Sequence, residues 1–234
     1  MAKQRNQSTA LFSTDKLLTV KPKTENQQLA VDYWSENYNL VLSGNAGTGK
    51  SFLALYLALK SLLLKKYERV VIFRSTVPTR NQGFLKGDLS EKQAPFEDCY
   101  RAIFSELLPT ISNPYDALKK EKTLEFKSTS FVRGLTISNS VVIVDEFQNL
   151  NFHELDSVIT RIGENSRIIF AGDYRQSDFR FEDEKSGVLT FLKVLANMPE
   201  DFQRVDFKIE DIVRSGLCKR YLLAEHDLRQ QGQL

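Results

Sequence analysis

Residues 44–51 read GNAGTGKS, the most informative motif of the chain. It matches the pattern G-x-x-x-x-G-K-[ST] at every position, and it lies between a short apolar segment, 40–43, and a segment rich in leucine and alanine, 50–66. A strand that leads through such a loop into a helix predicts a phosphate-binding loop. Its glycines let the backbone wrap an anion without Cβ clashes, and the amino terminus of the helix favours negative charge.

The loop predicts a bound nucleotide, for which ATP with Mg²⁺ is the expected pair. Lys50 should reach the β- and γ-phosphates, and the Ser51 hydroxyl should ligate Mg²⁺. A glycine-rich turn without a ligand is the alternative, which the strand and helix on either side make less plausible. The expected ATP-binding residues of the loop are Gly44, Asn45, Ala46, Gly47, Thr48, Gly49, Lys50 and Ser51.

Helices and strands alternate on both sides of the loop. Short apolar segments predict strands at 40–43, 69–74, 141–145, 167–171 and 204–208. Longer segments predict helices at 25–36, 50–66, 90–107, 187–197 and 216–229. Short, wholly apolar strands between longer helices are typical of strands covered on both faces. We therefore expect one α/β domain with a mostly parallel central sheet and helices on both of its faces.

Two regions depart from this alternation. Residues 1–23 are polar, lack periodicity and carry five basic residues against one aspartate, so they predict a flexible N-terminal arm. An arm that a partner subunit or a nucleic acid orders is the alternative. The domain then covers 24–234. Within it, residues 108–140 hold two prolines and a lysine-rich piece, which predict a peripheral insertion or hairpin.

Composition excludes several classes of protein. The 234 residues include 32 basic and 30 acidic side chains, a net charge of +2 that argues against a polybasic membrane-binding protein. Two cysteines and two histidines exclude a disulfide framework and a zinc site built from cysteine or histidine clusters. The longest apolar stretch, 52–64, is broken by Lys60 and Ser61 and is too short to span a bilayer. We expect a soluble, cytoplasmic protein whose chemistry uses carboxylates, lysine, arginine and backbone amides.

Polar residues follow two of the predicted strands. Asp145 and Glu146 end the strand 141–145, where Asp145 fits the role of holding the Mg²⁺ shell and Glu146 that of polarising an attacking water. A helix N-cap would explain one of these carboxylates but not both. Gln176 follows the next strand by a few residues and could sense the γ-phosphate, with a polar turn as the alternative.

An ordered set of motifs carries a resemblance to a known family. The set comprises TENQ (24–27), GNAGTGKS (44–51), FRSTV (73–77), GFLKGD (83–88), FVRG (131–134), VIVDEFQN (142–149), TRIG (160–163), GDYRQSD (172–178) and DIVRS (211–215). It is similar to the PhoH family of P-loop ATPases in the compact form found in phages, from about residue 23 to 222. The resemblance implies a RecA-like core related to superfamily 1 helicases and an ATPase activity tied to RNA, in the cytosol of a bacterium or of a phage-infected host.

The resemblance also implies roles for single residues. Gln27 matches a position that contacts adenine in related helicases, and Gln176 one that couples nucleotide state to nucleic acid. Arg161 and Arg214 match family arginines, either of which could supply transition-state charge as an arginine finger. The alternatives are a surface helix residue for Gln27 and ordinary salt bridges for the arginines. The family usually has a proline at the position of Lys86. With lysine there, either the loop is less rigid than in the family or Lys86 contacts a phosphate backbone.

A single core domain predicts an assembly. Superfamily 1 helicases place ATP between two RecA-like domains, whereas this chain has residues for only one. A neighbouring subunit in a head-to-tail ring would supply the missing charge. We therefore expect a homo-oligomer, in the first place a hexameric ring, in which Arg214, or else Arg161, acts on the neighbour's nucleotide.

Single-stranded RNA or DNA is the expected further partner, although the near-neutral net charge gives it no support. Basic residues interleaved with Phe84 and Phe131 suit single strands; the candidates are Arg74, Arg80, Lys86, Arg101 and Arg133. Three functions follow: an ATP hydrolase that remodels single-stranded nucleic acid, a non-catalytic nucleotide-switched assembly protein, and a small-molecule kinase. Glu146 and Gln176 speak against the kinase, because they would position water.

Overall fold

The computed structural model describes residues 12–75, 89–129, 132, 134–173 and 182–233. Its helices are η1 (Thr14–Lys16), α2 (Glu25–Ser35), α3 (Lys50–Leu63), α4 (Leu89–Leu107), α5 (Pro114–Lys120), η3 (Phe147–Asn149), α6 (Phe152–Ile159), α7 (Glu182–Ala196), η4 (Ile209–Asp211) and α8 (Gly216–Gln230). Its strands are β1 (Asn39–Gly44), β2 (Arg69–Arg74), β3 (Leu124–Ser128), β4 (Ser140–Asp145), β5 (Arg167–Gly172) and β6 (Phe202–Phe207).

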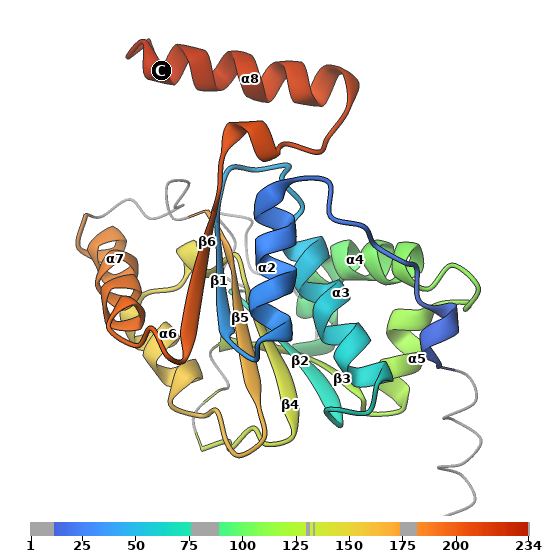
Figure 1. The fold of residues 1–234 in the computed structure, drawn as a ribbon. Helices are drawn as coiled ribbons and strands as arrows, with labels where there is room; N and C mark the ends of the chain where they lie inside the picture. Colours follow the sequence, from blue (N-terminus) through green and yellow to red (C-terminus); the bar gives the residue numbers. More distant parts are fainter. Residues whose placement is uncertain (1–11, 76–88, 130–131, 133, 174–181, 234) are drawn as a thin grey trace, which may run out of the picture.

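The strands form one sheet in the order β3-β2-β4-β5-β1-β6, and every pair of neighbours is parallel. The expected single α/β fold with helices on both faces is confirmed (Figure 1). Because β5 lies between β1 and β4, the carboxyl ends of these three strands are adjacent. This adjacency brings the residues that follow each strand to one edge of the sheet, where open parallel sheets bind ligands.

Two apolar layers enclose the sheet. In β4, Val141 and Ile143 face the layer made with α2, α3, α4 and α5, while Val142 and Val144 face the layer made with α6 and α7. The other inner strands alternate in the same way, which explains why they read as continuous apolar runs. Burial of each such side chain stabilises the fold by about 1.5–3 kcal/mol.

Residues 108–140 differ from the predicted hairpin. They form α5 and then β3, which pairs in parallel with β2 and extends the sheet at its edge. In β3 the buried Leu124 and Phe126 alternate with the partly exposed Glu125 and Lys127. An edge strand with two charged side chains lacks the wholly apolar signature by which the inner strands were identified.

The described part of the N-terminal segment, residues 12–23, also differs from a flexible arm. The Leu18 amide donates a 2.8 Å hydrogen bond to the Leu107 carbonyl at the end of α4. Phe12, Leu17 and Val20 pack against the core formed with α2 to α5. Three apolar residues spaced along a polar segment are enough to hold it on the surface of the domain, and residues 1–11 lie outside the described part.

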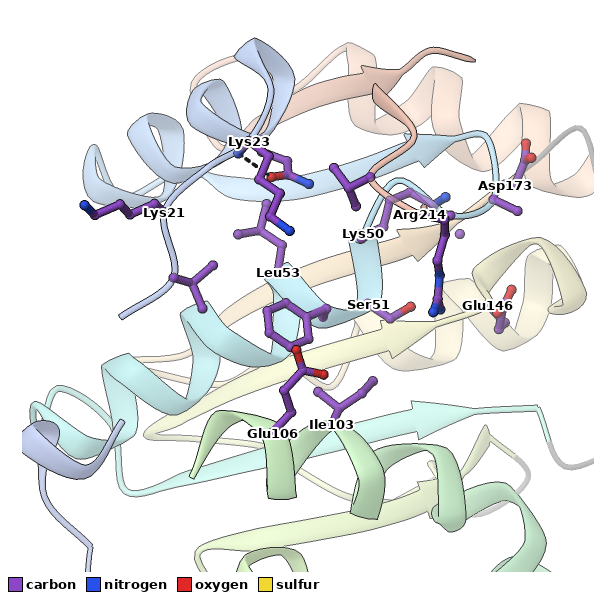
Figure 2. A pocket seen from close by; sticks show the side chains of 18 of the residues that line it. Lys21, Lys23, Lys50, Ser51, Leu53, Ile103, Glu106, Glu146, Asp173 and Arg214 are labelled. Atoms are coloured by element: carbon purple, nitrogen blue, oxygen red, sulfur yellow. Dashed lines mark hydrogen bonds between the residues drawn. The ribbon is translucent and has the colours of Figure 1, made fainter. Parts of the chain in front are cut away.

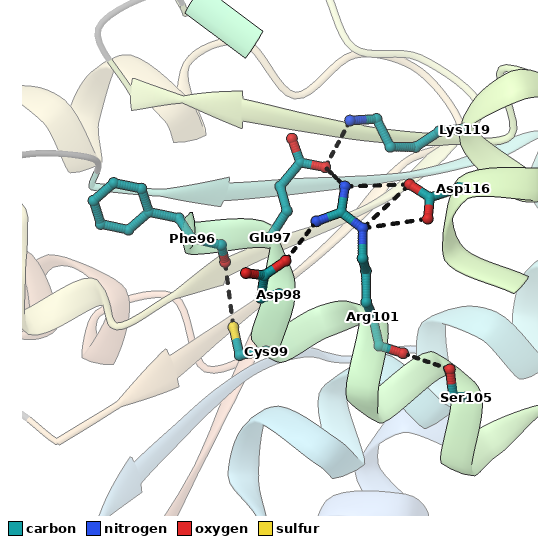
Figure 3. Close-up of polar contacts among 8 residues, drawn as sticks. All are labelled: Phe96, Glu97, Asp98, Cys99, Arg101, Ser105, Asp116 and Lys119. Carbon is teal, nitrogen blue, oxygen red and sulfur yellow. Dashed lines mark hydrogen bonds and ion pairs between the residues drawn. The ribbon is translucent and has the colours of Figure 1, made fainter. Parts of the chain in front are cut away.

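An ion-pair network around the buried Glu97 joins α4 to α5 (Figure 3). The Glu97 side chain is only 3% exposed, and its Oε2 lies 2.6 Å from Lys119 Nζ and 3.7 Å from the Arg101 guanidinium. Arg101 also pairs with Asp98 and Asp116 at 2.8 and 3.2 Å. Three carboxylates therefore surround Arg101, which explains its place in the structure without a nucleic acid.

Replacing Lys119 with methionine is expected to lower the free energy of unfolding by about 1–3 kcal/mol, because the buried Glu97 carboxylate loses its 2.6 Å ion pair and keeps the longer contact to Arg101. Urea unfolding measures this change. Lys120→Met is the matched control, because Lys120 is exposed at the next position of α5. Equal stability of the two variants would show that the 2.6 Å pair does not contribute.

Candidate nucleotide-binding site

A pocket of about 510 Å³ opens at the carboxyl edge of the sheet (Figure 2). Lys50 and Ser51 of the phosphate loop, Glu146 after β4 and Asp173 after β5 line one end of it. The other end is lined by the 20–23 segment and by Ile103 and Glu106 of α4. The pocket therefore joins a polar end, built from strand termini, to a more open end of mixed character.

The phosphate loop uses glycine where its backbone requires it. Gly47 and Gly49 have φ of +77° and +85°, a left-handed conformation that side chains disfavour. A Cβ on Gly44 would lie 1.9 Å from the Phe207 carbonyl oxygen of β6, so β1 and β6 could not approach as they do. The glycines thus permit a backbone conformation in which several amides can surround one anion.

Lys50 lies inside this loop and is only 9% exposed. Its Nζ donates hydrogen bonds to the carbonyls of Gly44 and Asn45, at 2.6 and 2.7 Å. Burial lowers the pKa of Lys50, although the nearby carboxylates, with Asp173 the strongest, act in the opposite direction. The ammonium is therefore partly desolvated, and the negative charge of a phosphate would compensate for that cost.

Asp145 is held by two hydroxyl groups. Ser51 Oγ donates to Asp145 Oδ1 at 2.7 Å, and the Tyr100 hydroxyl donates to Oδ2 at 2.8 Å. Tyr100 is fully buried, and burial together with the Asp145 charge raises its pKa, so it stays a protonated donor. Hydroxyl and carboxylate oxygens beside a phosphate loop fit Mg²⁺, which takes one or two protein ligands and completes its shell from water and phosphate. No motif in the sequence around Tyr100 predicts this contact.

Tyr100→Phe is expected to raise the Mg²⁺ concentration needed for half-maximal nucleotide binding by about tenfold, because outer-shell partners of metal ligands commonly contribute that much to affinity. A Mg²⁺ titration with a fluorescent ATP analogue measures it. Tyr56→Phe is the control, because Tyr56 is also buried and has no hydroxyl hydrogen bond within the described residues. Identical Mg²⁺ dependence of the two variants would remove Tyr100 from this role.

Glu146 lies beside Asp145 in a constrained position. Its φ is +52°, and Gln148 Nε2 donates a 2.6 Å hydrogen bond to its Oε2. Gln148 Oε1 in turn accepts from the Asp173 amide at 3.0 Å, so one buried side chain links the ends of β4 and β5. Burial and the Asp145 charge raise the pKa of Glu146, which makes it a better proton acceptor. Gln148 was not assigned a role from sequence; its only signal was its place two residues after the acidic pair.

Gln27 lies at the pocket, as its predicted role requires. Its Nε2 donates to the Thr48 carbonyl at 2.9 Å, and its Oε1 accepts from the Lys23 amide at 2.8 Å. The side-chain amide thus ties α2 and the N-terminal segment to the phosphate loop. One N–H and one lone pair remain for a ligand, and the contact to adenine stays a prediction.

The two candidate arginines lie at opposite edges of the sheet. Arg214 lines the pocket of its own chain, because the segment after β6 crosses the phosphate loop and Val213 donates its amide to the Gly47 carbonyl at 3.1 Å. This differs from the expected action of Arg214 on a neighbouring subunit. The Arg161 carbonyl accepts from the Ile137 amide before β4, at the amino edge, so Arg161 cannot reach this pocket within one chain.

Of the nucleic-acid candidates, Arg74 ends β2 beside the acidic pair, and it donates a 3.3 Å hydrogen bond to Cys99 Sγ. This position lets it balance the charge of Asp145 and Glu146. The predicted residues Arg80, Phe84, Lys86, Phe131, Arg133 and Gln176 lie outside the described residues.

Known proteins match this chain over most of its length. The PhoH-like protein family matches residues 19–225. A PhoH-like protein of Synechocystis sp. is 34% identical over 226 residues, which are 94% of this chain and 66% of the relative. A PhoH-like protein of Mycobacterium leprae is 31% identical over 217 residues, 90% of this chain and 61% of the relative. Protein PhoH of Escherichia coli is 32% identical over 189 residues, with coverages of 78% and 51%. The chain thus spans only 51% to 66% of these relatives.

Among solved structures, the large terminase of a thermophilic bacteriophage in complex with ADP overlays 85% of this chain and 49% of its own, with a TM-score of 0.49 and 10% identity. At this level the likeness says nothing about the function of the present chain.

No helix of the described residues has the length and apolar character to cross a membrane. The family match includes the phosphate loop, the acidic pair and Arg214. The resemblance seen in the motifs is confirmed, and the chain belongs to the PhoH-like protein family.

Proposed function

We propose that this protein hydrolyses ATP in the presence of Mg²⁺ and couples hydrolysis to binding or remodelling of single-stranded nucleic acid, with RNA favoured. One observation carries the ATPase part: Lys50, Glu146 and the Ser51–Asp145 pair line or border a single pocket at the carboxyl edge of the sheet. Family membership supports nucleotide binding.

Each residue then has a distinct task. The loop amides and Lys50 bind and orient the phosphates, while Ser51 and Asp145 hold the metal shell. When bound, Mg²⁺ neutralises charge on the β- and γ-phosphate oxygens. Glu146 accepts a proton from the attacking water, and Gln148 fixes the orientation of its carboxylate. Arg214, which lines the same pocket, supplies positive charge from the open side.

The nucleic-acid part of the proposal has a separate basis. It rests on the relation of the motif set to superfamily 1 helicases and on the predicted basic residues Arg80, Lys86 and Arg133. We further propose a hexameric ring in the cytoplasm, in which Arg161 reaches the pocket of the neighbour, because Arg161 lies at the edge opposite its own pocket. Arg214 no longer supports such a ring.

Steady-state ATP hydrolysis with and without single-stranded RNA tests the proposal, with single-stranded DNA of the same sequence in parallel. Stimulation by RNA above DNA supports the full proposal. Hydrolysis that neither polymer changes would leave the ATPase and remove the nucleic-acid coupling. No hydrolysis above that of Lys50→Ala would overturn the catalytic part.

A nucleotide-switched assembly protein is the second candidate. A specific observation favours it: Arg214 Cγ and Leu222 Cδ1 lie 3.1 and 3.0 Å from where a Cβ on Gly47 would be, so α8 and its leading segment contact the phosphate loop. In this case ATP would change the oligomeric state of Glu146→Gln and of the wild type equally, with turnover incidental.

A further inference from the structure

Helix α8 lies apart from the two layers of the domain. It has 15 residues, none of them buried, and Figure 1 shows it beyond the carboxyl edge of the sheet. Four of the ten exposed large hydrophobic side chains in the described part of the chain belong to this one helix. An amphipathic helix normally buries its apolar stripe, so these exposed apolar side chains indicate that α8 binds a partner.

One face of α8 is fixed by the phosphate loop. Leu222 is partly buried above Gly47, and Glu225 and His226 are partly buried on the same side, lining a second pocket of about 300 Å³ between α8 and the loop. This contact sets the rotation of the helix. The opposite face therefore points away from the domain.

The outward face carries an apolar stripe, which consists of Leu217, Tyr221, Ala224 and Leu228. Steps of four, three and four residues place these side chains on one side of a helix. All four are exposed, Leu217 by 74% and Tyr221 by 65%. The stripe runs almost the full length of α8, so its partner should be as long as the helix.

We propose that the outward stripe of α8 pairs in antiparallel orientation with the same stripe of a second copy of this chain. Such a pair places Leu217 against the partner's Leu228 and Tyr221 against the partner's Ala224, so that large and small side chains meet at the centre. A two-fold axis satisfies every contact twice, as isologous interfaces require.

Charge complementarity supports this occupant over others. Arg220 and Asp227 are exposed, and neither side chain has a hydrogen bond or ion pair within the described residues. Seven residues apart, they lie on the same flank of the stripe. In an antiparallel pair this flank of each copy lies beside the same flank of the partner, so Arg220 of each copy faces the partner's Asp227. In a parallel pair the two flanks lie on opposite sides of the interface, and these charges do not meet. The interface is small, so the pairing should be weak and concentration-dependent.

Sedimentation equilibrium over about a hundredfold concentration range tests the pairing. The wild type should gain a factor of two in mass with rising concentration. Arg220→Glu and Asp227→Arg should each weaken this association by about tenfold, because each places like charges together twice. The double variant Arg220→Glu/Asp227→Arg should restore it, because the exchange regenerates both ion pairs.

Lys193→Glu is the control, because Lys193 is an exposed lysine on α7 and makes the same charge change elsewhere. ATP-analogue binding checks that each variant is folded. A wild type that shows no mass increase, single variants that associate like the wild type, or a double variant that stays dissociated would each overturn the pairing. These outcomes are independent of ATP hydrolysis, which can fail or succeed without changing them.

Discussion

Lys50→Ala is expected to lower the rate of ATP hydrolysis by on the order of 10³-fold and to abolish detectable binding of the nucleotide at ordinary concentrations. The Lys50 ammonium lies within the phosphate loop and is held by two loop carbonyls, where it can exchange these partners for phosphate oxygens. Alanine leaves the loop amides in place but removes the only buried lysine of the described residues. Hydrolysis and equilibrium binding of a fluorescent ATP analogue measure both losses.

The same substitution should not lower the stability of the nucleotide-free protein. Burial lowers the pKa of Lys50, which means that the folded protein holds the charged form less favourably than water does. Removing that charge relieves a cost of folding, as is common for functional residues. Thermal unfolding without nucleotide checks this, with Lys60→Ala as the control at an exposed position of the same helix. A large loss of stability in Lys50→Ala alone would show that the hydrogen bonds of Lys50 to the loop carbonyls outweigh the cost of burying its charge, and would contradict this prediction.

Much of this fold could be predicted from sequence because its inner strands are covered on both faces. Segments such as 69–74 and 141–145 have a continuous apolar centre, with charged residues only at their ends, and the structure has strands there with those bounds or one residue more. The strand β3 was missed because only one of its faces is buried: Glu125 and Lys127 lie on the face opposite to Leu124 and Phe126. The search for wholly apolar segments finds strands covered on both faces, whereas a half-buried strand shows only a short alternation of apolar and polar residues.

The site could be predicted where a local motif determines it. The phosphate loop and the pair Asp145–Glu146 are local patterns, and the structure brings them together. Tyr100 contacts Asp145 across 45 positions of sequence, and no pattern around Tyr100 indicates that contact. Arg214 was expected to act on a neighbour, but the path of the chain after β6 returns it to its own pocket. Contacts that depend on the course of the backbone need the three-dimensional structure.

Glu146→Gln is expected to reduce the turnover number of ATP hydrolysis by about 10²–10³-fold while leaving nucleotide affinity near that of the wild type. Glutamine keeps the shape of the side chain and can still contact Gln148, but it cannot accept a proton. Rapid-quench hydrolysis and equilibrium binding separate the two effects. Asp156→Asn, on the exposed surface of α6, is the control for loss of one carboxylate.

The pH dependence gives a second and sharper test of Glu146. Burial and the Asp145 charge raise the pKa of Glu146 above that of an ordinary glutamate. Only the deprotonated form accepts a proton, so the turnover number of the wild type should fall as pH decreases through this raised pKa. That acid limb should therefore lie at higher pH than an unperturbed glutamate would give, and Glu146→Gln should lack it. An acid limb that persists unchanged in Glu146→Gln would assign the proton acceptor to another group. Asp173 would then be the first candidate, because it is a carboxylate that lines the same pocket.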